Sequence, residues 1–526
     1  MNPLPTLSTA HAGQAFPDEN LPEGTVVIGN ALRGPSTFDA DFVVVGSGAA
    51  GAVSAYRLTE LGYSVVIVEE GPWVRTREFS RDIGGTFERL MRDNGMQVLS
   101  GRAFMPLLQG KCVGGSTVIN SAIAWRIPED VIDTWSKDFG LGDSITMKAL
   151  EPHYDVLEAD LNVHAVEDDA LGENNAEFIR QAEALGLEPR RMKRYERGCK
   201  GSGRCLQGCP TAAKQGMNVT YVPWALRKGA RIVTDCRVVR VEIRGDRAVG
   251  VLGRTKSEVP VEFKARFGVL VAASTVQSPG ILRRSGIRSR ANGKHFQAHP
   301  GHGMGAIFKK RIDMTFGATQ GAESIRFRGS HRVKLETIAM PPELATARIP
   351  GIGEEFAGRL ARIDNLGVWV VQFRSDAEGV VKPGLFGEQV TFSPSTRDME
   401  NVRFACGKLA QMMFEGGAEE VWPGIFGLPA VLTDPDQIKL IEEGPTDPRC
   451  YSMVATHLFG ATRMGQNARS SVVSPDFESH EVKGLYVVDS GVFPTNLGVN
   501  PQHGIMAMSR LAATRLAERA SRFVAA

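Results

Sequence analysis

The segment Asp41-Phe-Val-Val-Val-Gly-Ser-Gly-Ala-Ala-Gly51 is a short apolar strand that runs directly into three spaced glycines. In this pattern Gly46 permits a tight turn, Gly48 lets the backbone approach a pyrophosphate, and Gly51 lets the next helix pack closely on the strand. The N-terminus of that helix then faces the phosphates with free N–H groups and the positive end of its dipole. The segment therefore predicts a dinucleotide-binding βαβ unit.

The sequence that follows completes this unit. A helical stretch has apolar residues on one face, at Ala52, Ala55, Leu58 and Leu61. A second apolar strand, residues 63–68, ends at Glu69, which lies 18 residues after Gly51. A carboxylate at this position accepts both hydroxyls of a ribose and repels a 2′-phosphate, which argues against NADP. The unit by itself does not choose between FAD and NAD.

The overall composition is that of a globular protein. The chain has 526 residues, of which 42% are hydrophobic and 23% are charged. These values exclude a disordered chain, a collagen-like repeat and a coiled coil. A net charge of +2 does not indicate a nucleic-acid-binding face, and seven cysteines are too few for a disulfide scaffold. No segment approaches the ~20 consecutive apolar residues of a membrane span.

The N-terminal segment, residues 1–38, is rich in Pro, Gly, Thr and Ala and shows no periodicity. It predicts an extended arm over the surface, and a loose tail is equally compatible. The first 30 residues contain no Lys or Arg. A secretory signal needs a basic region before its apolar core, and a twin-arginine signal needs paired arginines. The expected location is therefore cytoplasmic.

Four further segments indicate which cofactor is bound. They are Gly110-Lys-Cys-Val-Gly-Gly-Ser-Thr-Val-Ile-Asn120, Ser274-Thr-Val-Gln-Ser-Pro-Gly-Ile-Leu-Arg-Arg-Ser-Gly-Ile287, His457-Leu-Phe-Gly-Ala-Thr-Arg-Met-Gly465, and Gly484-Leu-Tyr-Val-Val-Asp489 leading to Phe493-Pro-Thr-Asn-Leu-Gly-Val-Asn-Pro-Gln502. In this order, the segments resemble the glucose–methanol–choline (GMC) oxidoreductase family of FAD enzymes. The resemblance spans residue 39 to about residue 518. The family's two signature stretches match at 110–126 and 274–287, and the second departs at its end, where Arg288 replaces the usual Gly.

The resemblance implies a fold of the α/β plus β class. A Rossmann-type FAD-binding domain carries an inserted substrate domain that is built on an antiparallel sheet. The implied divisions are an arm (1–38), a discontinuous FAD-binding domain (39–150, 215–300 and 451–526), a Cys-containing connecting segment (151–214) and a substrate-binding domain (301–450). Local patterns agree, with alternating strands at 231–253, a buried strand at 269–273, alternating stretches at 365–373 and 389–392, a helix at about 399–414 and a final helix after Gln502.

The resemblance also implies the residues that hold the cofactor. They are Gly46, Gly48, Gly51, Glu69, Gly110, Gly114, Gly115, Ser116, Asn120, Val238, Asp489 and Gln502. Val238 belongs to the strands expected beside the adenine, Asp489 to a position near the pyrophosphate or ribityl chain, and Gln502 to the surroundings of the flavin ring. Ile119 stands where some relatives carry a histidine that is covalently tied to the flavin. The FAD is therefore expected to be non-covalent at that position.

The implied chemistry is removal of a hydroxyl proton together with hydride transfer to flavin N5. His457 matches the family's catalytic histidine, and Asn500 matches its second polar partner, which would hold the substrate oxygen. The Asn-Pro pair at this place resembles the cholesterol-oxidase and long-chain alcohol oxidase branches. Because an amide does not titrate, a single base should govern the acid limb of the rate profile. His503 lies three residues past the matching position and is expected to support the site without touching substrate.

Two groups of side chains raise the question of a metal. His295, His299 and His302 lack the H-E-x-x-H spacing, so no zinc site is expected there. Cys199, Cys205 and Cys209 fall within eleven residues, and the last precedes a proline, as in ferredoxin-like runs.

The cysteine run has two open interpretations. It resembles the run in bacterial FAD-dependent glucose dehydrogenases, which carry a three-iron cluster that moves electrons from flavin to an external acceptor. Similar Cys-rich segments, followed by a Lys-Gln pair as at 214–215, also occur in the long-chain alcohol oxidase branch, where free or paired structural thiols are the alternative. Zinc would need a fourth ligand, which no neighbouring Cys or His supplies.

The expected function is oxidation of a small-molecule alcohol to an aldehyde or ketone, with oxygen or an external acceptor as the electron partner. The sequence does not choose between an oxidase and a dehydrogenase, and it does not identify the alcohol. The competing functions are a GMC-fold hydroxynitrile lyase, a light-driven fatty-acid decarboxylase and a non-enzymatic flavin-binding module. The presence of both His457 and Asn500 argues against the last two.

Overall fold

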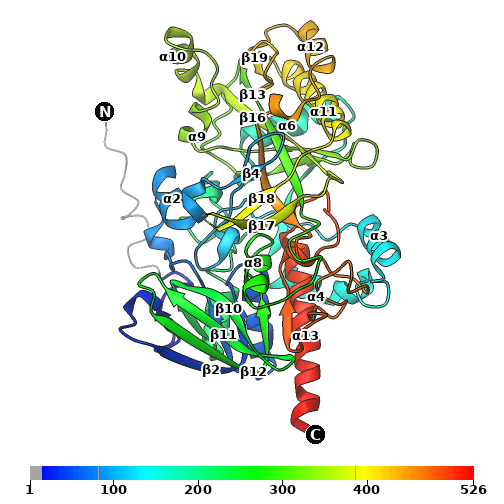
Figure 1. The fold of residues 1–526 in the computed structure, drawn as a ribbon. Coiled ribbons are helices and arrows are strands. Elements are labelled where there is room, and N and C mark those ends of the chain that lie inside the picture. Colours follow the sequence, from blue (N-terminus) through cyan, green and yellow to red (C-terminus); the bar gives the residue numbers. More distant parts are fainter. Residues whose placement is uncertain (1–14, 81, 386, 526) are drawn as a thin grey trace.

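The computed structural model describes residues 15–80, 82–385 and 387–525. Two β-sheets organise the described chain (Figure 1), and smaller elements connect them. Among the described residues the larger sheet has eight strands. Its order is β1 (Val26–Ile28), β9 (Arg231–Thr234), β3 (Val65–Val68), β2 (Ser36–Val45), β12 (Pro260–Val271), β11 (Arg247–Thr255) and β10 (Cys236–Arg244), with β21 (Leu485–Val487) also paired to β12. The strands from β1 to β12 are parallel, and β11 and β10 continue the sheet antiparallel.

The predicted βαβ unit forms the centre of this sheet. The strands β2 and β3 pair in parallel, and helix α1 (Ala49–Glu60) connects them. Ala52, Ala55 and Leu58 on the apolar face of α1 are fully buried, and α1 packs against α13 (Gln502–Ala525), as the spacing of the apolar residues predicts. The prediction was wrong for Leu61, which is 39% exposed because the helix ends one residue earlier.

The N-terminal segment is more ordered than an arm lying on the surface. Within its described part, β1 adds a parallel strand to the edge of the large sheet beside β9. In addition, β2 begins at Ser36 rather than at Asp41, because its first residues pair with β12 from Val261 onward. The prediction for residues 1–14 lies outside the described residues.

The second sheet is antiparallel and has seven strands among the described residues. Its order is β19 (Ala418–Trp422), β13 (Gln297–Phe308), β16 (Leu366–Phe373), β15 (Val333–Thr337), β14 (Ala322–Ser324) and β7 (Pro189–Arg191), with β20 (Met453–Phe459) also paired to β13. Helix α11 (Thr396–Glu415) packs on β16, β13, β15 and β19, and its buried apolar residues form one core with those strands. The predicted antiparallel sheet and the predicted helix at 399–414 are confirmed.

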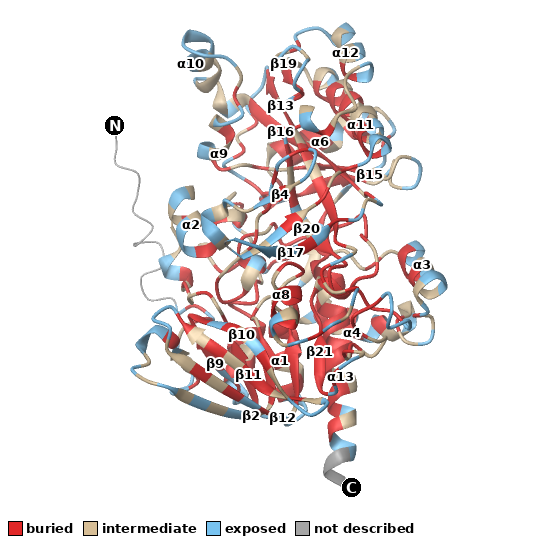
Figure 2. Ribbon diagram, in the orientation of Figure 1, coloured by how far each residue is buried: buried red, intermediate tan, exposed pale blue. Residues whose placement is uncertain are grey.

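The remaining elements cover the sheets and close the space between them. They are α2 (Ile83–Leu90), β4 (Val98–Ser100), β5 (Met105–Pro106), α3 (Glu129–Phe139), α4 (Met147–Asp160), β6 (Val163–Ala165), α5 (Asp168–Leu171), α6 (Glu173–Ala184), β8 (Lys193–Tyr195), α7 (Tyr221–Arg227), α8 (Gln277–Arg284), α9 (Pro342–Thr346), α10 (Glu354–Leu360), β17 (Val380–Gly384), β18 (Gly387–Thr391) and α12 (Ile438–Glu442). Figure 2 shows buried residues running through both sheets and through α13, and exposed residues on the outlying helices α2, α3 and α10. None of the helices in the described part of the chain is long and apolar enough to span a membrane.

Candidate active site

A cavity of about 850 Å³ lies between the two sheets. It extends from the loop after β2, past the start of α13, to β20 and β13 of the second sheet. The structure brings most of the predicted site residues to its wall, namely Gly46, Gly48, Glu69, Gly110, Gly115, Ser116, Asn120, Val238, His457, Asp489, Asn500 and Gln502. Gly51 and Gly114 are not on the wall and lie behind it. The cysteines of the 199–209 run are not on the wall either.

The glycine loop after β2 has the geometry that a close-approaching ligand requires. Gly46 has a φ of 98°, in the left-handed region, and a Cβ there would lie 2.5 Å from the carbonyl oxygen of Ala272. A Cβ on Gly51 would lie 1.9 Å from the carbonyl oxygen of Gly46, which explains the tight contact between α1 and the loop. A Cβ on Gly48 would meet only the Cα of Gly115, at 4.0 Å, so space remains in front of the helix N-terminus.

The second Gly-rich segment closes over this loop. The backbone N–H of Gly114 donates to Ser47 Oγ at 3.1 Å, and the N–H of Gly110 donates to Ser116 Oγ at 3.0 Å. Gly115 has a φ of 53°, and a Cβ there would lie 3.0 Å from the Cα of Gly48. The loop at 46–51 and the segment at 110–116 therefore form one surface, which we call the glycine cradle. Where the two come closest, at Gly48 and Gly115, neither has a side chain.

Glu69 directly follows β3 at the edge of the cavity and is buried. Its Oε2 accepts hydrogen bonds from the Ser47 N–H at 3.0 Å and from Ser47 Oγ at 2.6 Å, and its Oε1 accepts from the Gly71 N–H at 2.8 Å. Burial raises the pKa of Glu69. Each carboxylate oxygen has two acceptor positions, so one of them is left for a hydroxyl of a bound ligand.

Two more polar groups reach the cavity from the C-terminal part of the chain. Asp489 accepts hydrogen bonds from Ser278 Oγ and from the N–H groups of Gly491 (2.8 Å) and Ser274 (3.2 Å), and burial raises its pKa to about 6. The Asn120 amide donates to Gln502 Oε1, which joins the second Gly-rich segment to the first residue of α13.

His457 and Asn500 face one another at the end of the cavity near the second sheet. The Asn500 Nδ2 lies 3.4 Å from His457 Nε2. The other ring nitrogen, His457 Nδ1, lies 3.1 Å from His299 Nδ1, and the two rings stack with centroids 5.3 Å apart. Burial, with a smaller contribution from Lys334, lowers the pKa of His457 to about 3. The imidazole is therefore neutral at ordinary pH and can accept a proton.

The pairing of β20 with β13 contains a register shift next to His457. His299 pairs with His457 but Pro300 pairs with Ala455, so Thr456 is an extra residue in the ladder. A β-bulge of this kind turns a side chain toward a different face of the sheet. The sequence around Thr456 contains no pattern that predicts this bulge.

Lys334 is a member of this site that the sequence analysis missed. It lies on β15, is fully buried, and donates to Asn500 Oδ1 at 2.6 Å. It also forms ion pairs with Glu323 (2.9 Å) and Glu336 (2.7 Å). The segment 333–337 reads V-K-L-E-T, which is typical of a strand with one solvated face, and so gave no signal of a buried site.

The other histidines have separate partners. His503 Nε2 contacts Glu158 Oε1 at 3.1 Å and does not reach the cavity wall, in keeping with the expected supporting position. His295 Nδ1 contacts Glu378 Oε2 at 2.7 Å, and His302 Nε2 donates to the Pro423 carbonyl at 2.8 Å.

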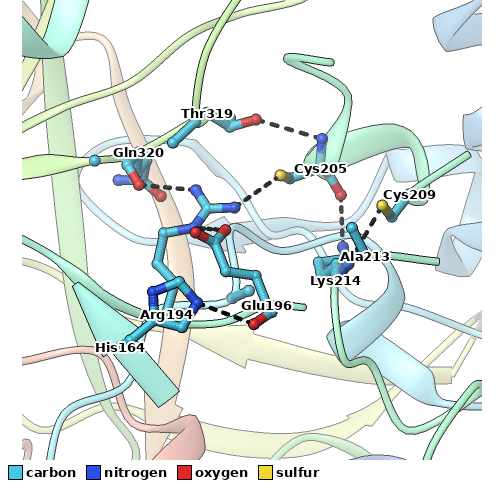
Figure 3. Close-up of polar contacts among 12 residues, drawn as sticks. His164, Arg194, Glu196, Cys205, Cys209, Ala213, Lys214, Thr319 and Gln320 are labelled. Atoms are coloured by element: carbon cyan, nitrogen blue, oxygen red, sulfur yellow. Dashed lines mark hydrogen bonds and ion pairs between the residues drawn. The ribbon is translucent and has the colours of Figure 1, made fainter. Parts of the chain in front are cut away.

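The three cysteines do not form a cluster-binding group. Figure 3 shows Cys205 and Cys209 with their polar contacts. In the described part of the chain, no three His, Cys, Asp or Glu side chains are placed to share a metal. Cys205 Sγ accepts from the Arg194 guanidinium at 3.2 Å, whereas Cys209 Sγ accepts from the Lys214 backbone N–H at 3.4 Å. Cys199 packs against a separate apolar cluster. The ligand set therefore does not fit an iron–sulfur cluster.

The Cys205 thiol lies among buried cations. Burial opposes its ionisation, but Arg194 and Lys214 outweigh burial and lower the pKa of Cys205 below its ordinary value. The Lys214 ammonium donates to the carbonyl oxygens of Val118 (2.6 Å), Asn120 (2.9 Å) and Cys205 (2.7 Å). The cysteine run is thereby tied to the second Gly-rich segment of the cavity wall.

Beyond His457 the cavity wall carries many apolar residues, together with the polar side chains of Gln320, Glu336, Arg348 and Gln372. Alternate residues of β13 are glycines, at 301, 303 and 305, and they pair with Gln372, Val370 and Val368 of β16. A Cβ on Gly303 would meet only the two valines, at 3.9 Å, so space remains above the sheet at this residue. At Gly301 and Gly305 the side chains of Val370 and Trp422 already fill that space, at 3.0 and 2.8 Å from the position of a Cβ. Further apolar wall residues are Ile338, Met340, Leu344, Leu366, Trp422 and Val454.

Comparison with known proteins agrees with this geometry. Residues 40–301 and 389–509 match the N- and C-terminal family models that are described as GMC oxidoreductase. An uncharacterized GMC-type oxidoreductase of Sinorhizobium fredii is 31% identical over 512 residues, which cover 94% of this chain and 96% of the relative. An uncharacterized GMC-type oxidoreductase of Mycobacterium tuberculosis is 31% identical over 497 residues, which cover 94% of this chain and 78% of the relative.

More distant similarities extend to named oxidases. A long-chain-alcohol oxidase of Arabidopsis thaliana is 25% identical over 536 residues, covering 94% of this chain and 69% of the relative. The fold is similar to that of formate oxidase from Aspergillus oryzae, with a TM-score of 0.73 at 17% identity over 93% of this chain and 100% of that chain. It is also similar to that of a pyridoxine 4-oxidase, with a TM-score of 0.69 at 17% identity over 90% of this chain and 98% of that chain.

Proposed function

Because the chain belongs to the GMC oxidoreductase family, we propose that it binds FAD and oxidises an alcohol to an aldehyde or ketone. The observation that carries the proposal is the pairing of His457 with Asn500 in a cavity that is continuous with the glycine cradle. A base and a hydrogen-bond donor side by side at such a place are what removal of a hydroxyl proton requires.

The residues of the cradle fit FAD. The N-terminus of α1, with Gly48 and Gly115 packed beside it, would receive the pyrophosphate, since neither glycine places a side chain in front of the helix N–H groups. Glu69 would accept from the adenosine ribose, and Val238 would lie beside the adenine. Asp489 and the Asn120–Gln502 pair would lie near the ribityl chain and the ring. Bound FAD would supply the hydride acceptor and, with Ile119 at the usual attachment position, would be held non-covalently.

The protein's own part of the reaction is proton transfer and orientation. The Asn500 Nδ2 would donate to the substrate oxygen, while the unprotonated Nε2 of His457 would accept the hydroxyl proton. Asn500 is buried and His457 is half-buried, and both lie on the cavity wall. A bound substrate would displace water from this place, so the hydroxyl proton would pass directly to His457. His299 would hold the His457 ring in place through the contact between the two Nδ1 atoms.

The apolar wall supports an alcohol with an apolar body as the substrate. The space at Gly303 of β13, beside Val368 and Val370 of β16, would accept such a body while its hydroxyl lies at His457. The relatives that are named long-chain-alcohol oxidases support the same class, and they support oxygen as the electron acceptor. An iron–sulfur relay is not part of the proposal, because no three His, Cys, Asp or Glu side chains of the described residues are placed to share a metal.

We also propose that the two sheets correspond to two functional parts, an FAD-binding domain at 39–150, 215–300 and 451–526 and a substrate-binding domain at 301–450. The sheet order supports a discontinuous FAD-binding domain, since β2, β12 and β21 come from distant parts of the chain. β20 and β7 extend the second sheet beyond 301–450, and β20 brings His457 to the junction.

The test is reduction of the flavin by alcohols without oxygen. Purified holoprotein is mixed with primary and secondary alcohols of graded chain length, and bleaching of the flavin absorbance is followed. Bleaching is expected for the apolar alcohols, followed by oxygen consumption on admission of air. Bleaching by alcohol, followed by reoxidation of the flavin by an artificial acceptor but not by oxygen, would make the enzyme a dehydrogenase. No bleaching by any alcohol would remove the proposal and favour a non-redox flavoprotein such as a lyase.

Two variants test the assigned roles. His457→Ala should slow flavin reduction by about 10²- to 10⁴-fold, the usual contribution of a positioned base. Asn500→Ala should slow it with FAD still bound. His295→Asn is the matched control, because His295 contacts Glu378 away from the cavity and has a φ of 58° that Asn tolerates. Equal rates for His457→Ala and the control would exclude His457 as the base.

A further inference from the structure

The orientation of the Asn500 amide decides what this side chain offers to its neighbours. One orientation presents the NH2 group to His457 and the cavity, and the other presents the oxygen. The Lys334 ammonium lies 2.6 Å from one end of the amide. Because an ammonium group only donates hydrogen bonds, the end that faces Lys334 must be the oxygen. The NH2 group therefore points to His457 Nε2.

Lys334 is itself held by a rigid polar framework. Glu323 and Glu336 flank it at 2.9 and 2.7 Å, and Lys334 has no exposed surface. Arg190 (2.8 Å) and Trp125 (3.1 Å) donate to Glu323 and fix it in turn. Burial tends to lower the pKa of Lys334, but the two carboxylates outweigh this and raise it. The lysine is thus a permanent cation with a fixed position.

We propose that Lys334 is a positioning residue that fixes the Asn500 amide so that its NH2 group, and not its oxygen, faces His457 and the cavity. The inference rests on the proposed function of the same site. It has two consequences for the chemistry. The substrate oxygen meets a hydrogen-bond donor, and His457 Nε2 accepts a hydrogen bond from Asn500, so this nitrogen carries no proton of its own.

The charge of Lys334 acts on His457 as well. Burial is the main reason for the low pKa of His457, and Lys334 lowers it further. The neighbouring strand β13 contributes His299, which is neutral because burial and the facing His457 lower its pKa. Arg328 and Arg374 add positive charge near His299. Removing Lys334 should therefore raise the pKa of His457, and the acid limb of the rate profile should move to higher pH.

The alternative is that Lys334 only stabilises the fold through its ion pairs with Glu323 and Glu336. A variant that removes one positive and one negative charge together distinguishes this role from the positioning of Asn500. Lys334→Met alone leaves two buried carboxylates with one cation fewer, which destabilises the fold whatever the role. Lys334→Met combined with Glu336→Gln removes one positive and one negative charge together. Lys334→Arg retains the charge and the donor, and should partly restore the orientation of Asn500.

The experiment uses the FAD-loaded wild type, Lys334→Arg, Lys334→Met and the double variant, with the alcohol that bleaches the wild type best. Flavin reduction should be about 10- to 100-fold slower in both Met variants, the cost of one lost charge-assisted hydrogen bond. The acid limb should move to higher pH, and FAD affinity should not change. Wild-type rate and pH profile in the folded double variant would overturn the proposal.

A second measurement does not depend on turnover or on any Lys334 variant. Nitrogen NMR of ¹⁵N-histidine-labelled wild type, with His457→Asn for assignment, reports whether His457 Nε2 carries a proton. An unprotonated Nε2 supports the proposal, and a protonated Nε2 that donates to Asn500 overturns it. Failure of the proposed function appears separately, as a wild-type flavin that no alcohol bleaches.

Discussion

Two glycines of the dinucleotide loop should fail in different ways when each is replaced by alanine. At Gly51 the new Cβ would lie 1.9 Å from the carbonyl oxygen of Gly46 and 2.9 Å from its carbonyl carbon. Backbone cannot rotate away as a side chain can, so α1 and the loop must separate. At Gly48 the new Cβ has its nearest neighbour at 4.0 Å, and the backbone has ordinary extended angles (φ −71°, ψ −165°). Only a ligand in the cradle would meet it.

The magnitudes follow from these distances. Gly51→Ala should lower the free energy of unfolding of the apoprotein by about 3 kcal/mol, the upper end of ordinary overpacking costs. Gly48→Ala should leave that free energy within about 0.5 kcal/mol of wild type, because no protein contact changes. Its methyl group would instead take space from the pyrophosphate and weaken FAD binding by about 10- to 100-fold, or about 1.4 to 2.8 kcal/mol.

Urea unfolding of the apoprotein and fluorescence titration with FAD measure the two effects separately. Gly358→Ala on α10 is the matched control, because a Cβ there meets nothing within 4 Å. It should leave FAD binding unchanged and stabilise the helix by up to about 1 kcal/mol. Wild-type stability of Gly51→Ala, or wild-type FAD affinity of Gly48→Ala, would show that the cradle is not built as described.

Two further groups give predictions away from catalysis. Burial lowers the pKa of His302 to about 4, so the unfolded chain, with a histidine pKa of about 6.5, binds the proton first and stability falls as pH drops from about 6.5 to about 4. His302→Gln should remove up to about 3 kcal/mol of that loss in urea unfolding across this range, and a pH-independent difference from wild type would contradict the assignment. At Cys205, Arg194→Met should move the titration of the ultraviolet thiolate absorbance to higher pH, with Cys205→Ser as the baseline. An unchanged titration would show that Arg194 does not stabilise the thiolate.

The parts of the site that could be predicted from sequence are the glycine loops, where the ligand would contact the backbone. Gly46, Gly48 and Gly115 are needed because a Cβ would strain the backbone or fill the cradle, and each stands in a motif of adjacent residues. The helix after Gln502 and the strands at 231–253 were also predictable, because the spacing of hydrophobic residues within a short segment distinguishes a helix from a strand. The cysteine run shows that spacing along the chain does not by itself make a metal site, since the three thiols are not placed to share a metal in the described part of the chain.

The sequence by itself determined the dinucleotide cradle, the family, and the pair of His457 and Asn500 as candidates for the chemistry, because these depend on residues in recognisable local order. Only the tertiary structure decided that Lys334 belongs to the site. Its strand alternates polar and apolar residues as an exposed edge would, yet all five residues are buried. The physical reason is that a buried cation needs acceptor groups around it, and those of Lys334 come from other parts of the fold. Glu323 contacts Lys334 from the neighbouring region of the sheet, and Asn500 contacts it from 166 residues further along the chain. Contacts between residues so far apart in sequence depend on the fold, and no short stretch of sequence predicts them.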